Sequence, residues 1–216
     1  MVKAKILSTK KLSFAQRELL LNANFSLTQY SAIEIESLAF EVTHSVKNAI
    51  ITSKNAAKAI INNKINVAQC LCVGEKTKAI LCKSNISVIK TCNTAKELAD
   101  FIVANLKNEA FTFFSGNKRR DELPNTLKQH QISLEEITVY KTIETNEKIT
   151  GLFNGILFFS PSAVRSFFSK NNHQDAILFC IGETTANEAL NFSKNVITAT
   201  KPTIENTIVQ VVKYFK

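Results

Sequence analysis

The sequence predicts an α/β protein of two similar lobes, each a parallel sheet flanked by helices, with the lobes joined by a two-stranded hinge. Two observations lead to this prediction. Strand-like and helix-like segments alternate along the 216 residues, and one group of these segments occurs twice. Alternation of strands and helices is typical of parallel sheets that are covered on both faces.

The repeated group is marked by a serine and a glycine. Asn48–Ser53 (NAIITS) leads through a helical pattern to Cys70–Gly74 (CLCVG), and Asn154–Ser160 (NGILFFS) leads through a second one to Leu178–Gly182 (LFCIG). The serine and the glycine are 21 positions apart in the first copy and 22 in the second. Only five glycines occur in the chain, so two of them before Glu-x-Thr indicate the same strand–helix–strand–helix unit twice.

The other elements follow from residue spacing and capping residues. Apolar residues at helical spacing follow the N-cap candidates Thr94 and Thr203, and Pro124 is tolerated only in a first helical turn. Asn24 can end the first helix in the left-handed conformation. We expect strands at 2–8, 86–89, 110–114, 137–144 and 195–198, an extended segment at 28–36, a turn at 115–117, and helices at 14–24, at 121–129 and after the two threonine caps.

The division into lobes follows from the position of the repeat. Its second copy has no strand–helix unit before it, whereas the N-terminus supplies a spare one. The economical arrangement pairs residues 1–33 with residues 148–216 in one discontinuous lobe and places residues 34–147 in an inserted lobe. A cleft between two lobes is a usual ligand site, so we expect the active site there.

The charge of the chain limits its partners. The formal net charge is +9, from 27 basic and 18 acidic residues, which suits nucleic acid, an acidic membrane surface or a polyanionic small molecule. The basic residues are scattered, and a solvated helix face is the simplest interpretation of the densest run, Lys118-Arg119-Arg120. We therefore expect a small polyanion and no nucleic acid. Because neither a signal-like N-terminus nor an apolar run of ~20 residues occurs, we expect a cytoplasmic protein without a membrane partner.

The cysteines and histidines lack the spacing of a metal site or a disulfide framework. The five cysteines are odd in number, Cys70-x-Cys72 has no second pair, and the three histidines stand far apart. We expect no metal, no disulfides, and cysteines that are mostly buried as small apolar residues in strands.

Two serines are the first candidates for ligand binding. Ser53 and Ser160 each end a strand and open a helix, where backbone N–H groups suit phosphate or carboxylate. Plain capping is the alternative for either serine alone, but its recurrence at the carboxyl edges of both sheets favours a ligand. The glycine turns add Thr77, Thr184 and Thr185 as hydroxyl donors. Neither turn is a dinucleotide or P-loop fingerprint, so NAD and ATP are not expected.

Tyr140 is the candidate for chemistry in a site that is rich in donors and poor in bases. The chain has no G-x-S-x-G motif and no histidine beside a candidate nucleophile. Such a site binds a polyanion and stabilises developing charge. A phenol is protonated at neutral pH and can donate to a leaving oxygen, although a strand tyrosine by itself more often packs.

Together these segments resemble the uroporphyrinogen-III synthase family. Ser115–Thr142 (SGNKRRDELPNTLKQHQISLEEITVYKT) is similar to that family's G-N-x-x-R-[DE]-x-L-P-x-x-L signature and the V-Y-x-T that follows it. The segments ITSKNA (51–56), FFSPSAV (158–164) and CIGETTANEAL (180–190) resemble its helix-start motifs in order. Lys10 keeps the basic charge where members often carry Thr-Arg-Pro after the first strand.

The resemblance implies a monomeric lyase of tetrapyrrole (haem) biosynthesis that needs no metal or organic cofactor. Its substrate is hydroxymethylbilane, a linear tetrapyrrole polycarboxylate, which is cyclised to uroporphyrinogen III with inversion of the last pyrrole. Tyr140 matches the family tyrosine that assists departure of the hydroxyl. Substrate-binding positions are matched by Lys10, Ser53, Thr77, Asn117, Ser160, Ser162, Thr184 and Thr185. A non-catalytic two-lobed binding protein for a polyanionic small molecule is the alternative.

Overall fold

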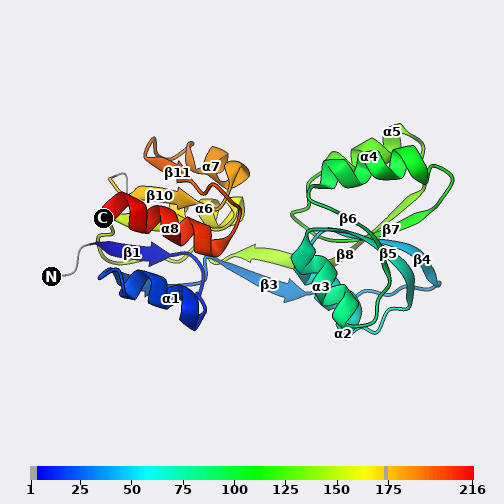
Figure 1. Cartoon of the computed structure of the whole chain (residues 1–216), viewed down its shortest axis with the longest axis horizontal. Coiled ribbons are helices and arrows are strands. Elements are labelled where there is room, and N and C mark those ends of the chain that lie inside the picture. The colour runs from blue at the N-terminus through cyan, green and yellow to red at the C-terminus, as the bar shows by residue number, and fades with distance from the viewer. Residues whose placement is uncertain (1–3, 173–174) are drawn as a thin grey trace. The chain divides into compact units, whose positions relative to one another are not determined.

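The computed structural model describes residues 4–172 and 175–216 and divides into two compact units (Figure 1). The discontinuous unit comprises Met1–Glu34 and Ile143–Lys216, and the inserted unit comprises Ile35–Thr142. The inserted unit ends at Thr142, earlier than the boundary expected after residue 147. Residues 143–147 belong instead to the discontinuous unit, to which they are hydrogen-bonded. Thr145 N, for example, donates to Ala32 O over 3.1 Å. Residues 2 and 3 of the first expected strand lie outside the described residues.

The inserted unit is built around a six-stranded sheet. Its elements are β3 (Ile33–Ser37), β4 (Val46–Ile51), α2 (Lys54–Asn62), β5 (Val67–Val73), α3 (Glu75–Lys83), β6 (Val88–Cys92), α4 (Ala95–Asn105), β7 (Phe111–Gly116), α5 (Glu122–Gln129) and β8 (Leu134–Glu144). The strand order is β3-β8-β7-β4-β5-β6, and the strands from β8 to β6 pair in parallel.

The discontinuous unit is built around a five-stranded sheet. Its elements are β1 (Lys5–Ser8), α1 (Phe14–Leu21), β2 (Ser26–Gln29), β9 (Gly155–Phe158), α6 (Pro161–Phe168), β10 (Ile177–Cys180), α7 (Glu183–Ala189), β11 (Val196–Thr198) and α8 (Ile204–Phe215). The strand order is β11-β10-β9-β1-β2, and all neighbours pair in parallel.

Five strands of the inserted unit and the five strands of the discontinuous unit are arranged in the same way, but the chain enters the two arrangements at different strands. In the inserted unit the chain passes through β4, β5 and β6 before β7 and β8. In the discontinuous unit β9, β10 and β11 take the places of the first three strands, and β1 and β2 take those of the last two. The repeated segments occupy equivalent places: Ser53 and Ser160 cap α2 and α6, and Gly74 and Gly182 precede α3 and α7.

Helices cover both faces of each sheet (Figure 1). Successive residues of a strand point to opposite faces, so they pack against different helices. In β4, Ala49 and Ile51 pack with α2 and α3, whereas Ile50 packs with α4 and α5. In β9, Ile156 packs with α6 and α7, whereas Leu157 packs with α1 and α8. All five side chains are fully buried, as expected for parallel strands covered on both sides.

β6 spans Val88–Cys92 where a strand was expected at 86–89, and β8 begins at Leu134 rather than at 137. Three further elements differ from those expected. The extended segment at 28–36 is divided between β2 and β3, which belong to different sheets. The turn expected at 115–117 starts later, because Gly116 still pairs with Tyr140 at the end of β7. The first helix ends at Leu21, and Asn24 follows it with a φ of 63°, the left-handed conformation expected there.

The chain passes between the units on β3 and β8. Leu38 N donates to Val139 O and Thr145 N donates to Ala32 O, each over 3.1 Å, so partner numbers rise on one strand as they fall on the other. This antiparallel pair lies at the edge of the six-stranded sheet. No helix in the described part of the chain has the length and apolar character needed to cross a membrane.

Candidate active site

The polar candidates follow strands at a point where the connections of each sheet reverse direction. β4 and β7 are neighbours from which the chain proceeds toward opposite sides of the sheet, and β9 and β1 have the same relation in the discontinuous unit. Open α/β sheets bind ligands outside the carboxyl ends of strands at such switch points. Ser53 and Gly116 lie at this edge in the inserted unit, and Ser160 and Lys10 lie at the equivalent edge.

Tyr140 and Ser53 meet at the switch point of the inserted unit. Tyr140 Oη donates to Ser53 Oγ over 3.2 Å, and Ser53 Oγ also accepts from Ala56 N over 3.1 Å as the N-cap of α2. The ring fits because residue 116 is glycine. A Cβ at Gly116 would lie 2.8 Å from the phenol oxygen and nearer still to two ring carbons. The phenol of half-buried Tyr140 is therefore held against a helix N-terminus.

A cavity of about 380 Å³ opens beside Tyr140 and is lined entirely by the inserted unit. Its polar lining includes Thr52, Asn93, Thr94, Ser115, Arg119 and Arg120, and its apolar lining includes Val73, Phe113 and Leu123. Ligand pockets commonly range from about 300 to 1,000 Å³, so this one suits a single ring of a larger ligand. A second cavity of about 460 Å³ has neither Gly116 nor Tyr140 in its lining and is not the candidate site.

The basic run at residues 118–120 lies in the connection between β7 and α5. The interpretation as a helix face is wrong, because α5 begins only at Glu122. Arg119 Nε lies 2.6 Å from Glu136 Oε2, and its Nη1 pairs with Asp121. Arg119 and Arg120 both line the cavity beside Tyr140. Sequence reasoning missed this placement, although a basic run directly after a strand at the switch point would have indicated it.

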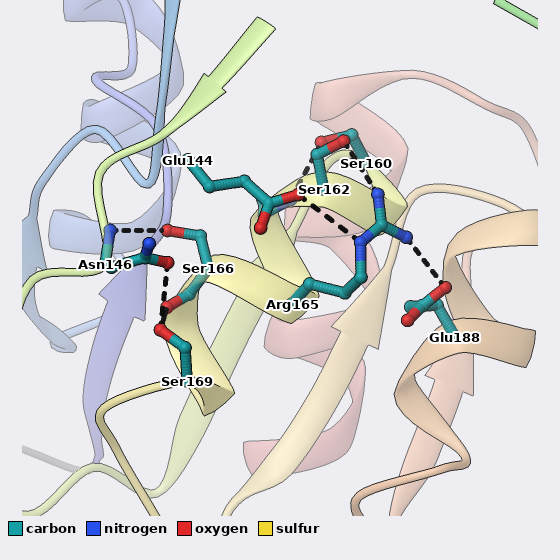
Figure 2. Close-up of polar contacts among 9 residues, drawn as sticks. Glu144, Asn146, Ser160, Ser162, Arg165, Ser166, Ser169 and Glu188 are labelled. Carbon is teal, nitrogen blue, oxygen red and sulfur yellow. Dashed lines mark hydrogen bonds and ion pairs between the residues drawn. The ribbon is translucent and has the colours of Figure 1, made fainter. Parts of the chain in front are cut away.

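The equivalent edge of the discontinuous unit has an arginine network instead of a tyrosine. Ser160 Oγ caps α6 and accepts from the backbone N–H three positions on, over 3.2 Å. One turn into α6, Arg165 lies between Glu144 and Glu188, at 3.3 and 3.0 Å (Figure 2). Its Nη2 also donates to Ser162 Oγ over 3.1 Å. Ser162 is buried, with 7% of the residue exposed, and its hydroxyl is engaged within its own helix.

Lys10 and Asn117 occupy matching connections, after β1 and after β7. Lys10 is exposed, and its ammonium has no ion-pair partner among residues 4–172 and 175–216. Its backbone carbonyl accepts from Ser8 Oγ over 2.6 Å, which fixes the connection locally. Asn117 is exposed too, but its Oδ1 accepts from Thr142 N over 2.9 Å. The cation of Lys10 suits a carboxylate ligand, whereas the Oδ1 of Asn117 is engaged with Thr142 N and only its Nδ2 could donate to a carboxylate.

The threonines of the two glycine turns differ in exposure. Thr77 and Thr185 each follow the glycine by three positions, donate their N–H to its carbonyl over 3.0 and 3.1 Å, and are 4% and 2% exposed. Thr184 is exposed in the first turn of α7. The glycines differ as well, because Gly74 has a φ of 84° and Gly182 has a φ of −176°. Only the first turn therefore uses the left-handed freedom of glycine.

The cysteines are free, and most are buried. Cys70, Cys72, Cys92 and Cys180 lie buried on strands, whereas Cys82 on α3 is exposed. Burial raises the pKa of the Cys180 thiol to about 12 and raises that of Cys70 further, so both remain protonated thiols. Among the described residues, no group of three or more histidine, cysteine or acidic side chains could hold a metal ion.

Each unit is a doubly wound α/β domain, and the two units have the same strand order in permuted sequence. In each, a helix capped by a serine hydroxyl begins at the switch point. The chain is therefore a two-domain α/β protein with hydrogen-bond donors along the carboxyl edges of its sheets. The sequence matches the family described as uroporphyrinogen-III synthase HemD over residues 17–208. The chain therefore belongs to the uroporphyrinogen-III synthase family, whose enzymes make uroporphyrinogen III in haem biosynthesis.

Solved structures of this family have a similar fold. The uroporphyrinogen-III synthetase of Helicobacter pylori aligns with a TM-score of 0.74 and 16% identity, covering 98% of this chain and 99% of that one. A mutant uroporphyrinogen III synthase from the extremely thermophilic bacterium Thermus thermophilus aligns with a TM-score of 0.66 and 14% identity, covering 98% of each chain. At these identities the likeness concerns the fold. Among curated proteins, none matches this sequence.

Proposed function

We propose that the chain is a cyclising hydro-lyase that converts hydroxymethylbilane to uroporphyrinogen III, with Tyr140 assisting the departure of the hydroxyl. The observation that carries this assignment is the Tyr140–Ser53 contact beside a cavity at the switch point of the inserted unit. Family membership supplies the reaction, and this contact supplies a proton donor at an edge that suits a ligand.

The proposed chemistry begins with loss of the terminal hydroxyl. The Tyr140 phenol gives up its hydrogen bond to Ser53 Oγ and donates that proton to the departing oxygen, which leaves as water, while the lone pair of the adjacent pyrrole nitrogen replaces the broken C–O bond. The carbon left electrophilic then bonds to the α-carbon of the last pyrrole that already carries a methylene bridge, and the C–C bond from that α-carbon to its old bridge breaks. The released bridge carbon bonds to the other α-carbon of the same pyrrole, which loses a proton that returns to the Tyr140 phenolate, so that the ring is inverted with two C–C bonds formed and one broken. The sum is loss of one water, which needs no oxidant or reductant.

A donor-rich setting fits the charges that change along this path. The departing oxygen gains negative charge, and a neutral hydroxyl chain from Tyr140 to Ser53 ends at the N-terminus of α2, where the helix dipole favours negative charge. Arg120 lines the same cavity and suits a carboxylate of the reacting ring, whereas Arg119 there is already paired with Asp121 and Glu136. A cavity of about 380 Å³ accommodates one substituted ring and leaves the rest of a linear tetrapyrrole for other donors.

The remaining donors are proposed to bind other carboxylates of the substrate. The exposed cation of Lys10 and the helix N-termini capped by Ser53 and Ser160 support this role most directly. Thr184 is exposed at the start of α7 and suits the same role. The buried Thr77, Ser162 and Thr185 hold the first turns of their helices and thereby orient the backbone N–H groups.

Isomer analysis of the product tests the assignment. Hydroxymethylbilane is prepared fresh and incubated with and without the protein, and the products are oxidised and separated into type I and type III porphyrins. Spontaneous closure gives the uninverted type I isomer, so the protein is expected to convert the product to type III. Binding of substrate without a change of isomer would support the non-catalytic polyanion-binding alternative and refute the proposed reaction.

A further inference from the structure

The pairing of β7 with β8 contains an irregularity directly before Tyr140. Ser115 pairs with Thr138, but the next residue, Gly116, pairs with Tyr140, so Val139 is an extra residue on β8. A bulge of this kind locally disrupts the ladder and re-aims the side chain that follows it. Here it sets Tyr140 opposite the residue that has no Cβ, which leaves room for the ring.

Asn117 braces the segment that follows the bulge. Its backbone N–H donates to Tyr140 O over 3.2 Å, and its side-chain Oδ1 accepts from Thr142 N over 2.9 Å. Because β7 ends at Gly116, no further β7 residue offers Thr142 N a backbone acceptor, and the Asn117 side chain takes that place. Tyr140–Thr142 is thus fastened at both ends by one residue.

We propose that Asn117 is a positioning residue that keeps the Tyr140 phenol against the Ser53 hydroxyl, rather than a substrate ligand. This inference rests on the proposed function, because it assigns Asn117 to the same reaction through Tyr140. The contact of Oδ1 with Thr142 N fixes the orientation of the amide, and the variants below test whether its Nδ2 binds a substrate carboxylate instead. A brace matters because small misplacements of a reacting group are costly in rate.

Substitution by aspartate and by alanine separates bracing from substrate binding. Asn117→Asp keeps an oxygen acceptor for Thr142 N, whereas Asn117→Ala removes it. If Asn117 braces, the aspartate variant retains kcat within about twofold and the alanine variant loses about fivefold to tenfold. If the amide instead binds a substrate carboxylate, both variants retain kcat, and the aspartate variant has the higher KM because it adds a like charge.

A double-mutant cycle with Tyr140→Phe tests whether Asn117 acts through the phenol. Positioning predicts that Asn117→Ala lowers kcat strongly in the wild-type background and by less than about twofold when the phenol is already absent. Asn154→Ala is the matched control: Asn154 N donates to Lys5 O, and its Oδ1 accepts from Lys5 N over 2.8 Å, in the discontinuous unit. Its effect on kcat should be independent of Tyr140→Phe.

Two further readouts decide the remaining outcomes. Amide hydrogen exchange at Thr142 should accelerate in Asn117→Ala and stay slow in Asn117→Asp, and this measurement needs no substrate. Unchanged exchange, equal loss of kcat in both backgrounds, or an effect confined to KM overturns the inference while leaving the proposed function intact. If the wild-type protein forms no type III product, the proposed function fails and the catalytic role of Asn117 fails with it.

Discussion

Ser53 and Ser160 cap equivalent helices in the two units, and their hydroxyls accept from the backbone N–H three positions on, over 3.1 and 3.2 Å. Beside Ser53 stands the Tyr140 phenol, 3.2 Å away. Beyond Ser160, the second turn of α6 carries Arg165, which is paired with two carboxylates. The same strand order therefore carries a phenol, Tyr140, beside the cap in the inserted unit, and an arginine paired with two carboxylates, Arg165, near the cap in the discontinuous unit.

This difference separates what the shared fold supplies from what each unit adds. The fold gives each unit a switch point, a hydroxyl cap and helix N–H groups, which are features that bind anions. Chemistry needs a group that can transfer a proton, and among residues 4–172 and 175–216 a phenol bonds to the cap of α2 but not to that of α6. We therefore propose that bond breaking depends on the inserted unit and that the caps of each unit bind carboxylates.

The largest contrast should come from the tyrosines of the two units. Tyr140→Phe is expected to lower turnover by about 100-fold, because one general-acid contact is lost, and to leave Tm nearly unchanged. Tyr30 is buried in the discontinuous unit, and its hydroxyl has no hydrogen-bond partner among the described residues. Tyr30→Phe should leave turnover unchanged and stabilise the protein by about 1 kcal/mol, because a buried unpaired hydroxyl is removed. Steady-state kinetics and thermal unfolding measure both.

If Tyr140→Phe and Tyr30→Phe lowered turnover equally, the proposal that bond breaking depends on the inserted unit would be wrong. A stability loss in Tyr140→Phe large enough to account for its kinetics would make Tyr140 a packing residue.

Glycine-to-alanine substitutions in the two sheets should act on different properties. Gly116→Ala places a methyl group where the Tyr140 ring lies and should lower turnover by about 10- to 100-fold through misplacement of the phenol. Gly155→Ala on β9 places its methyl group 2.9 Å from Phe179 and 3.1 Å from Ile6, so it should cost about 1–3 kcal/mol of stability by overpacking. Kinetics compared at equal folded fraction separate the effects, and unaltered turnover in Gly116→Ala would contradict this placement of the ring.

Removal of the two caps should give similar stabilities and different kinetics. Ser53→Ala and Ser160→Ala each lose a capping hydrogen bond, at about 1 kcal/mol of stability. Ser53→Ala also removes the acceptor of the Tyr140 phenol, so its kcat should fall about twofold to tenfold. Ser160→Ala should raise KM and spare kcat. The assignment fails if both variants change kcat to the same degree.

The smallest effect is expected at the amino edge of the inserted sheet. Hydrogen bonds from Lys47 and Asn48 lower the pKa of Glu109 below its ordinary value near 4.5. Because the folded-state pKa is the lower one, the stabilisation is present above the unfolded pKa and is lost as pH falls through the folded value. Glu109→Gln should therefore be slightly less stable than wild type at neutral pH and equal to it in acid, with turnover unchanged. Denaturant titrations across pH test this, and a fall in kcat would show that the amino edge affects the site.

Local features of the structure were predictable from the sequence. Caps, glycine turns and apolar alternation depend on a few neighbouring residues, so the strand–helix repeat was predicted at the right positions, including the caps Thr94 and Thr203. The cysteines were expected to be mostly buried in strands, and four of them are, whereas Cys82 on a helix surface is the exception.

The contacts that build the site depend on distant residues and could not be read from local patterns. Tyr140 and Ser53 are 87 positions apart, and their meeting depends on a bulge that the alternation of β8 does not reveal. The extension of β7 to Gly116 was not predicted, and Arg119 and Arg120 of the basic run, which precede α5, line the cavity. The same extension gave Asn117 a backbone partner on β8.

The isomer ratio formed by Tyr140→Phe tests the central assignment most directly. Purified wild-type protein and the variant receive the same fresh hydroxymethylbilane, and the type III and type I products are quantified after complete consumption. If the Tyr140 phenol assists the chemical step, wild type yields type III, and the slowed variant yields a mixture in which spontaneous type I has increased. A variant that matches wild type in both rate and isomer ratio would show that Tyr140 only packs and that the chemistry lies elsewhere.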